Sequence, residues 1–186
     1  SIIPINLGGS FKTLITIHDM FPIQYVRYFG KIYSYYFKFN LGVTLRHTDM
    51  ILYNSEQTKD DTEVYFPKAK KIPSCNAYII SNPLTRYVPD ENYFLYIGNM
   101  EKRKGVDILI KAYRRYREEG GTRPLILAGK MQEDDIEQLL ETALTEVEGL
   151  TYLGYVSHTT RYDLYNNCSC FVFPSMAEGF GMPILE

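Results

Sequence analysis

Two glutamates near the end of the sequence frame a glycine-rich segment. Glu178 and Glu186 lie eight positions apart, and residues 179–182 between them read Gly-Phe-Gly-Met. An apolar run precedes this segment and Pro183 follows it, so the spacing predicts a loop between a strand and a helix, with Pro183 at the first helical position. Glycines let a backbone approach a ligand closely, and the free N–H groups of a helix N-terminus favour anions. The segment is therefore a candidate binding site for a diphosphate.

The two glutamates suit a different part of such a ligand. A carboxylate repels a phosphate, so Glu178 is expected to accept hydrogen bonds from sugar hydroxyls beside the phosphate site. Glu186, in the first turn of the predicted helix, is placed to bind another polyol, such as a ribose. The alternative interpretation of these residues is an ordinary strand-to-helix turn with two solvated glutamates.

A second loop, residues 98–105, combines glycines with cations and reads Gly-Asn-Met-Glu-Lys-Arg-Lys-Gly. Arg103 and Lys104 stand just before a predicted helix, where the helix dipole disfavours positive charge. A bound pyrophosphate would give these cations a function, because a charge-assisted hydrogen bond is worth about 1.5–3 kcal/mol. A solvated basic turn is the alternative.

His18 follows a predicted strand in the first half of the sequence, where parallel sheets bind ligands. A histidine with a structural role is the alternative. The sequence holds no Asp-x-Asp pair, no dinucleotide-binding glycine fingerprint and no P-loop. The three histidines, His18, His47 and His158, are too scattered to indicate a zinc site. We therefore expect no cofactor and no metal.

The segments that must position these residues alternate between short apolar runs and helical periods. Apolar runs predict strands at residues 11–17, 50–53 and 78–80, and again at 93–97, 125–128, 150–153 and 170–173. Helical periodicity spans residues 106–116 and 136–147, and Ser55 and Ser157 are predicted N-caps of two further helices. Strands alternating with helices in this way predict an α/β fold with parallel sheets.

A polar stretch that contains Pro89 and Asp90 divides the sequence. We predict two Rossmann-like halves, residues 1–84 and 93–186, joined by a linker at 85–92. The sequence begins with Ser1 rather than Met and stops just after the glycine-rich loop. We therefore expect both halves to be incomplete, and the isolated chain to be poorly stable or inactive.

Composition excludes several classes of protein. The chain has 186 residues, of which 45% are hydrophobic and 23% are charged, which excludes a disordered chain. A formal charge of −2 argues against bulk nucleic-acid binding. Three cysteines without a Cys-x-x-Cys pair indicate a reducing compartment, so a cytoplasmic location is expected. Two of them, Cys168 and Cys170, are predicted to face the core. No apolar run is long enough to span a bilayer.

Residues 20–48 are unusual because they contain no Asp or Glu, whereas Arg27, Lys31, Lys38 and Arg46 are basic. Eight aromatic residues lie between positions 25 and 39. We expect a Tyr-rich helix that packs on the first sheet with its cations solvated. The alternative is peripheral contact with the inner face of a membrane, because a basic and aromatic helix can lie on an anionic lipid surface.

Together these segments resemble glycosyltransferase family 4, the group 1 glycosyltransferases, which are retaining, nucleotide-sugar-dependent enzymes of GT-B fold. Residues 177–186 (AEGFGMPILE) match the family's E-x7-E signature, and residues 93–105 (YFLYIGNMEKRKG) look like its first donor-binding loop. Residues 16–22 (TIHDMFP) are similar to a His-containing segment of the acceptor-side domain, and residues 49–61 also look familiar. The resemblance covers nearly the whole chain.

The resemblance implies catalytic roles for four residues. Glu178 would contact hydroxyls of the donor sugar, and His18 would approach the same sugar. Lys104, helped by Arg103, would hold the diphosphate. Without metal ligands, these cations and the helix end would stabilise the negative charge of the leaving group.

The resemblance also implies a set of substrate-binding residues. Glu186 would bind the nucleotide ribose, and Tyr155 and Val156 would lie near the base. Four residues of the glycine-rich segment would surround the phosphates and the sugar: Gly179, Phe180, Gly181 and Met182. The backbone N–H groups of residues 180–182 would contact the phosphate or the sugar. Asn99 departs from the family, because many members carry Arg there. Asn99 does not neutralise charge, so either Arg103 compensates or donor affinity is lower.

The function that the resemblance implies is a metal-independent hexosyltransferase. It would move a hexose from a GDP- or UDP-sugar donor to a glycan or lipid-linked acceptor with retention of configuration, in cell-surface polysaccharide assembly. Two alternatives stay open: a nucleotide-sugar epimerase of GT-B fold, and a non-catalytic nucleotide-binding module. No nucleic-acid partner is expected.

Overall fold

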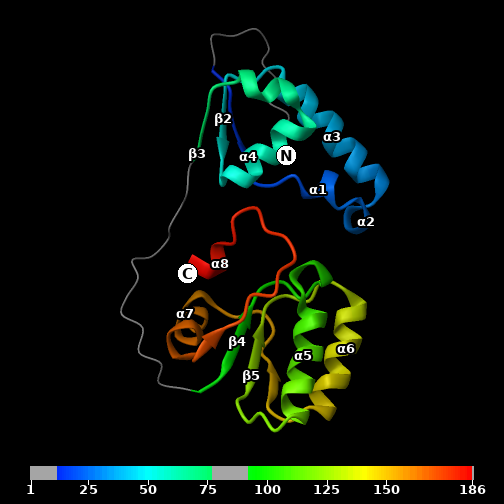
Figure 1. The fold of residues 1–186 in the computed structure, drawn as a ribbon, viewed down its shortest axis with the longest axis vertical. Coiled ribbons are helices and arrows are strands. Elements are labelled where there is room, and N and C mark those ends of the chain that lie inside the picture. Colours follow the sequence, from blue (N-terminus) through cyan, green and yellow to red (C-terminus); the bar gives the residue numbers. More distant parts are fainter. Residues whose placement is uncertain (1–11, 77–91, 186) are drawn as a thin grey trace. The chain divides into compact units, whose positions relative to one another are not determined.

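The structure, a computed structural model, describes residues 12–76 and 92–185 (Figure 1). The chain divides into two compact units. Ser1–Ile79 and Glu178–Phe180 form the first unit, and Ile80–Ala177 and Gly181–Glu186 form the second. The predicted linker at residues 85–92 stays a prediction, because residues 77–91 lie outside the described part of the chain.

The first unit contains a parallel three-stranded sheet. Its strands β1 (Leu14–Ile17), β2 (Met50–Tyr53) and β3 (Ser74–Asn76) lie in the order β1-β2-β3. Strands were predicted at 11–17 and 50–53, and the structure confirms them within its described residues. The predicted strand at 78–80 lies outside those residues. Strand β3 has no apolar run and so gave no sequence signal; it forms because its backbone pairs with that of β2.

Five helical segments accompany this sheet: α1 (Phe21–Gln24), α2 (Val26–Phe29), α3 (Lys31–Leu45), α4 (Glu56–Tyr65) and the 3-10 segment η1 (Pro67–Lys71). Ser55 caps α4 as predicted, because its Oγ accepts a hydrogen bond from the Thr58 backbone N–H at 3.0 Å. Ile17, Ile51 and Tyr53 from the sheet form the core of this unit with Met20 and other apolar residues.

Helix α3 packs on the core of the first sheet as predicted, because Leu45 lies in that core and Leu41 packs against it. Its cations Lys31 and Lys38 are exposed, also as predicted, but most of its aromatic rings take no part in the packing. Tyr33, Tyr35, Tyr36 and Phe39 are exposed, whereas the small polar side chain of Ser34 is buried. The helix turns toward its unit a face that holds polar residues, so burial of the aromatic rings is not what holds α3 in place.

No helix within residues 12–76 and 92–185 is both long enough and apolar enough to cross a membrane.

The second unit is built on a parallel four-stranded sheet in the order β6-β5-β4-β7. Its strands are β4 (Phe94–Ile97), β5 (Leu125–Ala128), β6 (Leu150–Tyr152) and β7 (Cys170–Phe171). The helices are α5 (Val106–Glu118), α6 (Asp134–Glu146), α7 (His158–Asn167) and α8 (Met182–Leu185), with a 3-10 turn η2 (Lys102–Lys104) before α5. All four predicted strands exist, and the predicted α/β class with parallel sheets is confirmed.

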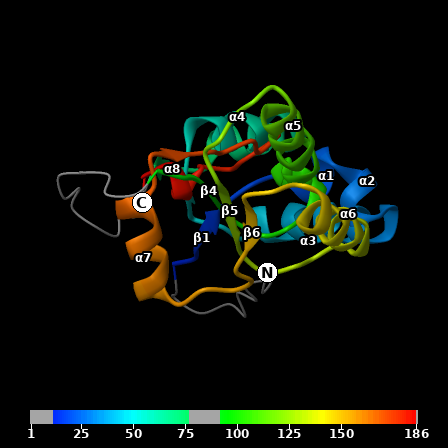
Figure 2. The same ribbon diagram turned by 90° about the horizontal axis from the view of Figure 1, so that it is seen from below.

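Helices cover both faces of this second sheet (Figures 1 and 2). Tyr96, Leu125 and Leu127 point toward α5 and α6 and form the larger core with the apolar faces of those helices. Leu95 and Ile97 point to the opposite face and pack with residues of α7 and its flanks. Because successive strand residues alternate between faces, β4 is buried on both sides, as its near-continuous apolar sequence requires.

Two details of the second unit differ from the sequence predictions. Cys168 is buried, but Cys170 is exposed, so the two do not share a core-facing position. Cys168 ends helix α7 and only Cys170 lies in β7, so the period of two that a strand would impose does not apply. Pro183 is the second residue of α8 rather than the first, because the helix begins at Met182.

Candidate functional site

Three glycines lie in register where strands β4, β5 and β6 end. Ile97 pairs with Ala128, and Leu127 pairs with Tyr152, so Gly98, Gly129 and Gly154 follow at the same edge. Gly98 donates its backbone N–H to Ala128 O at 3.0 Å, and Gly129 donates to Gly154 O at 2.8 Å. Gly129 has φ +144°, and a Cβ atom there would meet Gly98 O at 1.8 Å. Only glycine permits this approach, which leaves backbone accessible at the carboxyl edge of the sheet.

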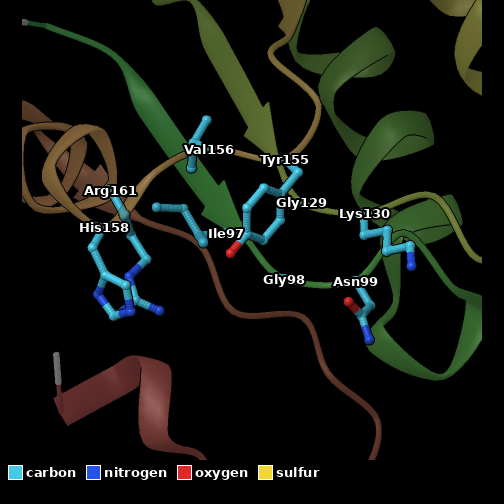
Figure 3. Close-up of a pocket in the computed structure, with 9 residues that line it drawn as sticks. All are labelled: Ile97, Gly98, Asn99, Gly129, Lys130, Tyr155, Val156, His158 and Arg161. Atoms are coloured by element: carbon cyan, nitrogen blue, oxygen red, sulfur yellow. The ribbon is translucent and has the colours of Figure 1, made fainter.

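A cavity of about 190 Å³ opens at this edge (Figure 3). Its walls come from the loops after the three strands and from the first turns of α7. Nine residues line it: Ile97, Gly98, Asn99, Gly129, Lys130, Tyr155, Val156, His158 and Arg161. In open parallel sheets, ligands bind at the carboxyl ends of the strands, so the position of the cavity is that of a ligand site.

The cavity is lined by cations and by no carboxylate. Asn99 and Lys130 lie on one side of the Tyr155 ring, and His158 and Arg161 lie on the other (Figure 3). Arg161 Nη2 lies 3.0 Å from His158 Nδ1. An Arg is always protonated, so it donates this hydrogen bond and His158 Nδ1 accepts it. The arrangement suits a ligand that is anionic or rich in hydrogen-bond acceptors.

Helix α7 presents these two side chains because of its N-cap. Ser157 Oγ accepts a hydrogen bond from the Thr160 backbone N–H at 3.1 Å, as the sequence predicted. His158 is the first residue of the helix and Arg161 is one turn further, so the two share a face. The N-terminal end of a ten-residue helix adds its partial positive charge to the same side of the cavity.

The loop before α5 is fastened to the segment that follows β7. Arg103 Nη2 pairs with Glu101 Oε1 at 2.6 Å, and Arg103 Nη1 donates to Ala177 O at 3.2 Å. The Met176 backbone N–H donates to Arg103 O at 3.1 Å. Arg103 and Glu101 are both less than one fifth exposed, so this pair is shielded from solvent. Arg103 therefore holds the backbone that leads into the glycine-rich segment.

Lys102 and Lys104 flank Arg103 and have different surroundings. Lys102 Nζ lies 2.5 Å from Asp135 Oδ2, at the start of α6. This hydrogen bond raises the pKa of Lys102 and lowers the pKa of Asp135. Lys104 is half-buried, and its backbone N–H donates to Glu101 O at 3.1 Å. Lys102 is thus paired within the unit, and the role of Lys104 in holding a diphosphate stays a prediction.

The structure brings together some of the predicted site residues and leaves others apart from the cavity. Asn99, Tyr155 and Val156 all line it, although Asn99 lies more than fifty positions from the other two in sequence. Arg103 and Lys104 belong to the same unit but are not among the lining residues.

The remaining predicted residues are distributed over both units. Gly181, which has φ +79°, and Met182 lie at the start of α8 in the second unit. The residues grouped with the first unit are Glu178, Gly179, Phe180 and His18, of which His18 is exposed directly after β1. Glu186 lies outside the described residues, and the predicted roles of all these residues stay predictions.

Three lining residues with a nitrogen-bearing side chain had no predicted role: Lys130, His158 and Arg161. Lys130 follows Gly129 directly after a predicted strand, so its position at the carboxyl edge was available from the sequence. His158 was considered only as a metal ligand, and Arg161 was not considered. The N-cap at Ser157 was the signal that could have found both, because it places the first turn of a helix just after the loop of β6. Within the described residues, no three His, Cys, Asp or Glu side chains gather as a metal ion would require.

Comparison with known sequences shows which family the second unit represents. The sequence model of the family described as "Glycosyl transferases group 1" matches residues 85–186, which is more than half of the chain and includes every residue of the cavity. The chain belongs to the group 1 glycosyl transferases. The resemblance inferred from the E-x7-E segment and the first donor-binding loop is therefore confirmed.

Curated relatives are similar in sequence over nearly the whole chain. The "O-antigen chain mannosyltransferase B" of Escherichia coli is 33% identical over 94% of the chain and 50% of the relative. The "Serotype-specific mannosyltransferase WbdA" of Escherichia coli is 29% identical over 95% of the chain and 24% of the relative. The chain thus spans at most half the length of these two relatives.

A solved structure with a similar fold is that of S. aureus TarM in complex with fondaparinux, α-GlcNAc-glycerol and UDP. The TM-score is 0.58 and the sequence identity is 17%. The similarity covers 80% of the present chain and 29% of the TarM chain. This likeness concerns the fold, which is that of the GT-B glycosyltransferases.

Proposed function

We propose that the protein transfers a hexose from a nucleotide diphosphate sugar to a hydroxyl of a glycan or lipid-linked acceptor. The observation that carries the proposal is the cation-lined cavity at the glycine edge of β4, β5 and β6, inside the segment that matches the family. Two relatives named as mannosyltransferases support mannose as the hexose, and the name of one of them, an O-antigen chain mannosyltransferase, supports polysaccharide assembly as the setting.

The cavity supports a specific arrangement of the donor. In this proposal the base lies against Tyr155 and Val156, because an aromatic ring and an apolar side chain offer a stacking surface. Lys130 and Asn99 lie on the side of the Tyr155 ring away from His158 and Arg161, and in this proposal they are nearer the diphosphate (Figure 3). Gly98 and Gly129 allow the phosphates to approach the backbone, and Lys104 contributes a further positive charge. Whether the base is guanine or uracil is decided by binding measurements with GDP and UDP.

The proposed reaction requires that the protein stabilise negative charge on the leaving diphosphate. The bond between the anomeric carbon and the diphosphate oxygen breaks, and the acceptor oxygen bonds to the same carbon with retention of configuration. Its proton passes to the leaving phosphate. Negative charge grows on that phosphate while the sugar gains oxocarbenium character, so cations fixed before the reaction lower the barrier. We propose that Lys104, the Arg103 loop and the N-terminal end of α8 provide this stabilisation without a divalent ion, and that Glu178 and His18 contact the sugar.

The test separates binding from transfer. The full-length protein is titrated with GDP and with UDP by calorimetry, and transfer from labelled GDP- and UDP-hexoses is measured with and without a chelator. We expect one nucleotide to bind, transfer to survive the chelator, and the product to keep the anomeric configuration of the donor. A chelator that abolishes transfer would contradict metal independence. Formation of an epimerised nucleotide sugar without transfer would contradict the proposed reaction.

The variant Glu178→Gln tests the role of the first glutamate. The carboxylate is expected to hold sugar hydroxyls rather than phosphate, so the variant should lose transfer by about 100-fold or more while nucleotide affinity changes little. Glu141→Gln is the matched control, because Glu141 is exposed on α6. If Glu178→Gln abolished nucleotide binding but left transfer per bound donor unchanged, the assignment would be wrong.

A further inference from the structure

Two loops of the second unit are fastened to each other by hydrogen bonds that run in opposite directions. Arg103 Nη1 donates to Ala177 O at 3.2 Å, and the Met176 backbone N–H donates to Arg103 O at 3.1 Å. Both the side chain and the backbone of Arg103 therefore hold the segment that follows β7. We call residues 101–105 and 174–177 together the loop clamp.

Glu101 decides where the guanidinium of Arg103 points. Arg103 Nη2 donates to Glu101 Oε1 at 2.6 Å, and the two side chains are only 16% and 19% exposed. Because a guanidinium is planar and rigid, a carboxylate on one nitrogen fixes the direction of the other, which reaches Ala177 O. Solvent screens such a shielded pair only weakly, and removal of one partner leaves the other charge uncompensated.

Gly105 closes the loop clamp at its other end by a close approach of backbones. Its φ is +70°, and a Cβ atom there would meet Pro174 O at 2.3 Å. A glycine adopts this conformation without strain, whereas any other residue would push the two loops apart. An ion pair and a backbone contact thus hold the same two loops together.

The loop clamp is continuous with the wall of the cavity. The Glu101 backbone N–H donates to Asn99 O at 3.1 Å, and the Tyr96 hydroxyl donates to the same carbonyl at 2.8 Å. Asn99 lines the cavity. Successive contacts therefore run from the cavity wall through Glu101 and Arg103 to Ala177, the residue that directly precedes Glu178 in the chain.

We propose that Glu101 and Arg103 are positioning residues for the proposed sugar transfer. Together they fix the backbone of Ala177, from which the chain continues into Glu178 and the glycine-rich segment. A carboxylate 2.6 Å from Arg103 Nη2 repels phosphate, so the pair suits this role better than direct binding of a diphosphate. The inference rests on the proposed function and deepens it, because it gives Glu101 a role and makes Arg103 act through backbone.

Hydrogen exchange tests the loop clamp without any reaction. The Met176 amide donates to Arg103 O, so its exchange rate in the full-length protein reports whether the clamp is closed. Glu101→Gln should raise this rate by about 10-fold, because a charge-assisted hydrogen bond becomes a neutral one. The matched control is Glu119→Gln, which removes an exposed carboxylate that pairs with Arg115. Equal Met176 exchange in the two variants would overturn the proposal.

Kinetics separates positioning from binding. Glu101→Gln and Arg103→Gln should each lower kcat for transfer by about 10-fold or more, since a small displacement of a reacting geometry is costly. Affinity for the nucleotide diphosphate, measured by calorimetry, should change by less than about 2-fold. If affinity falls as much as kcat in Arg103→Gln, then Arg103 is a ligand of the diphosphate and the proposal fails.

The two residues should behave as one unit. Because Glu101 acts by orienting Arg103, the double variant should lower kcat no further than Arg103→Gln alone. Losses that add up would show that Glu101 and Arg103 act separately, which would contradict the proposal. Circular dichroism checks that each variant is folded.

Gly105→Ala opens the loop clamp and leaves both charges in place. It should raise Met176 exchange and lower kcat as Glu101→Gln does. Gly120→Ala is the matched control, because Gly120 also has positive φ but a Cβ atom there meets nothing within 4 Å. Normal transfer in Gly105→Ala with faster Met176 exchange would show that closure of the clamp is not needed for the reaction.

Failure of this inference is distinct from failure of the proposed function. If the unaltered protein transfers no sugar, but Glu101→Gln accelerates Met176 exchange, the proposed function fails and the loop clamp stands. If the unaltered protein transfers sugar and Glu101→Gln transfers equally well, the proposed function stands and the positioning role is wrong.

Discussion

At the scale of single residues, cations of the second unit divide into those that hold the structure and those placed for a ligand. Arg103 is paired with Glu101 and bonded to Ala177 O, and Lys102 is paired with Asp135. Lys130 and Arg161 line the cavity instead. The sequence did not distinguish structural cations from cations that line the cavity. Their charge is the same, and only the position of each side chain in the structure separates them.

Lys104 gives the first prediction at this scale. Lys104→Ala removes a positive charge from the proposed path of the leaving diphosphate, so the barrier to transfer should rise by about 2–4 kcal/mol, seen as a lower kcat. Contacts between the protein and the donor sugar should be affected less than turnover. Lys111→Ala, at an exposed position of α5, is the matched control. Steady-state kinetics that are unchanged in Lys104→Ala would reject the role.

Arg161 gives a second prediction. Arg161→Ala removes a cation from the cavity wall and the donor of the hydrogen bond to His158. We expect nucleotide affinity to fall about 10-fold, since one charge-assisted hydrogen bond is lost. Calorimetry with the nucleotide that the unaltered protein binds measures the change. Arg115→Ala removes an exposed Arg of α5 that pairs with Glu119, and should leave affinity unchanged. Equal affinities in the two variants would remove Arg161 from the site.

At the scale of elements, the cavity depends on how closely the loops after β4 and β5 approach. Tyr152 donates its hydroxyl to Gly129 O at 2.8 Å, and Tyr96 donates to Asn99 O at 2.8 Å, so tyrosines from two strands hold the loop carbonyls. Burial raises the pKa of Tyr152, so this hydroxyl stays a donor further into the alkaline range than an exposed tyrosine would. The edge is thus a fixed structure and not a set of free loops.

Gly129→Ala tests this close approach. A Cβ atom would lie 1.8 Å from a backbone oxygen, which no side-chain movement relieves, so the second unit should lose about 3 kcal/mol or more of stability. Gly120→Ala is the matched control: Gly120 also has positive φ, but a Cβ there would meet nothing within 4 Å. It should cost only about 1 kcal/mol of backbone strain. Denaturation followed by circular dichroism compares the two, and equal losses would show that strain, not contact, decides at Gly129.

At the scale of the whole molecule, each unit has its own parallel sheet and its own core. The first unit has the smaller sheet, and its core includes Tyr53, which is 1% exposed. Burial, and to a lesser degree Glu63, raises the pKa of Tyr53 to about 12. The folded state therefore prefers the neutral phenol more strongly than the unfolded state does.

The stability of the first unit should depend on alkaline pH. Because the folded pKa of Tyr53 lies above the ordinary value, its contribution to stability is complete below pH 10 and is lost as pH rises from about 10 to about 12. Tyr53→Phe should weaken this dependence, since no proton is then lost. Tyr35→Phe, which changes an exposed tyrosine, should leave it in place. Denaturation midpoints between pH 8 and 11 measure the difference, and identical profiles for the two variants would contradict the prediction.

Local patterns in the sequence were sufficient to locate several elements and loops. Hydrophobic periodicity located α5 and α6, the N-caps at Ser55 and Ser157 located the starts of α4 and α7, and glycines after apolar runs located the loops of the carboxyl edge. The signature around Glu178 and the loop that begins at Gly98 pointed to the family, because these segments are contiguous in the chain.

Which loops become neighbours and which helix face stays exposed depend on long-range packing, and no local pattern encodes them. Strand order places β6 beside β5 and β5 beside β4, so Asn99, Lys130 and Arg161 reach one cavity although no sequence spacing links them. Strand β3 forms through backbone pairing, which needs no apolar side chains. Helix α3 buries Ser34 and exposes Tyr35, because burial depends on what packs against a face and not on the hydrophobicity of that face alone.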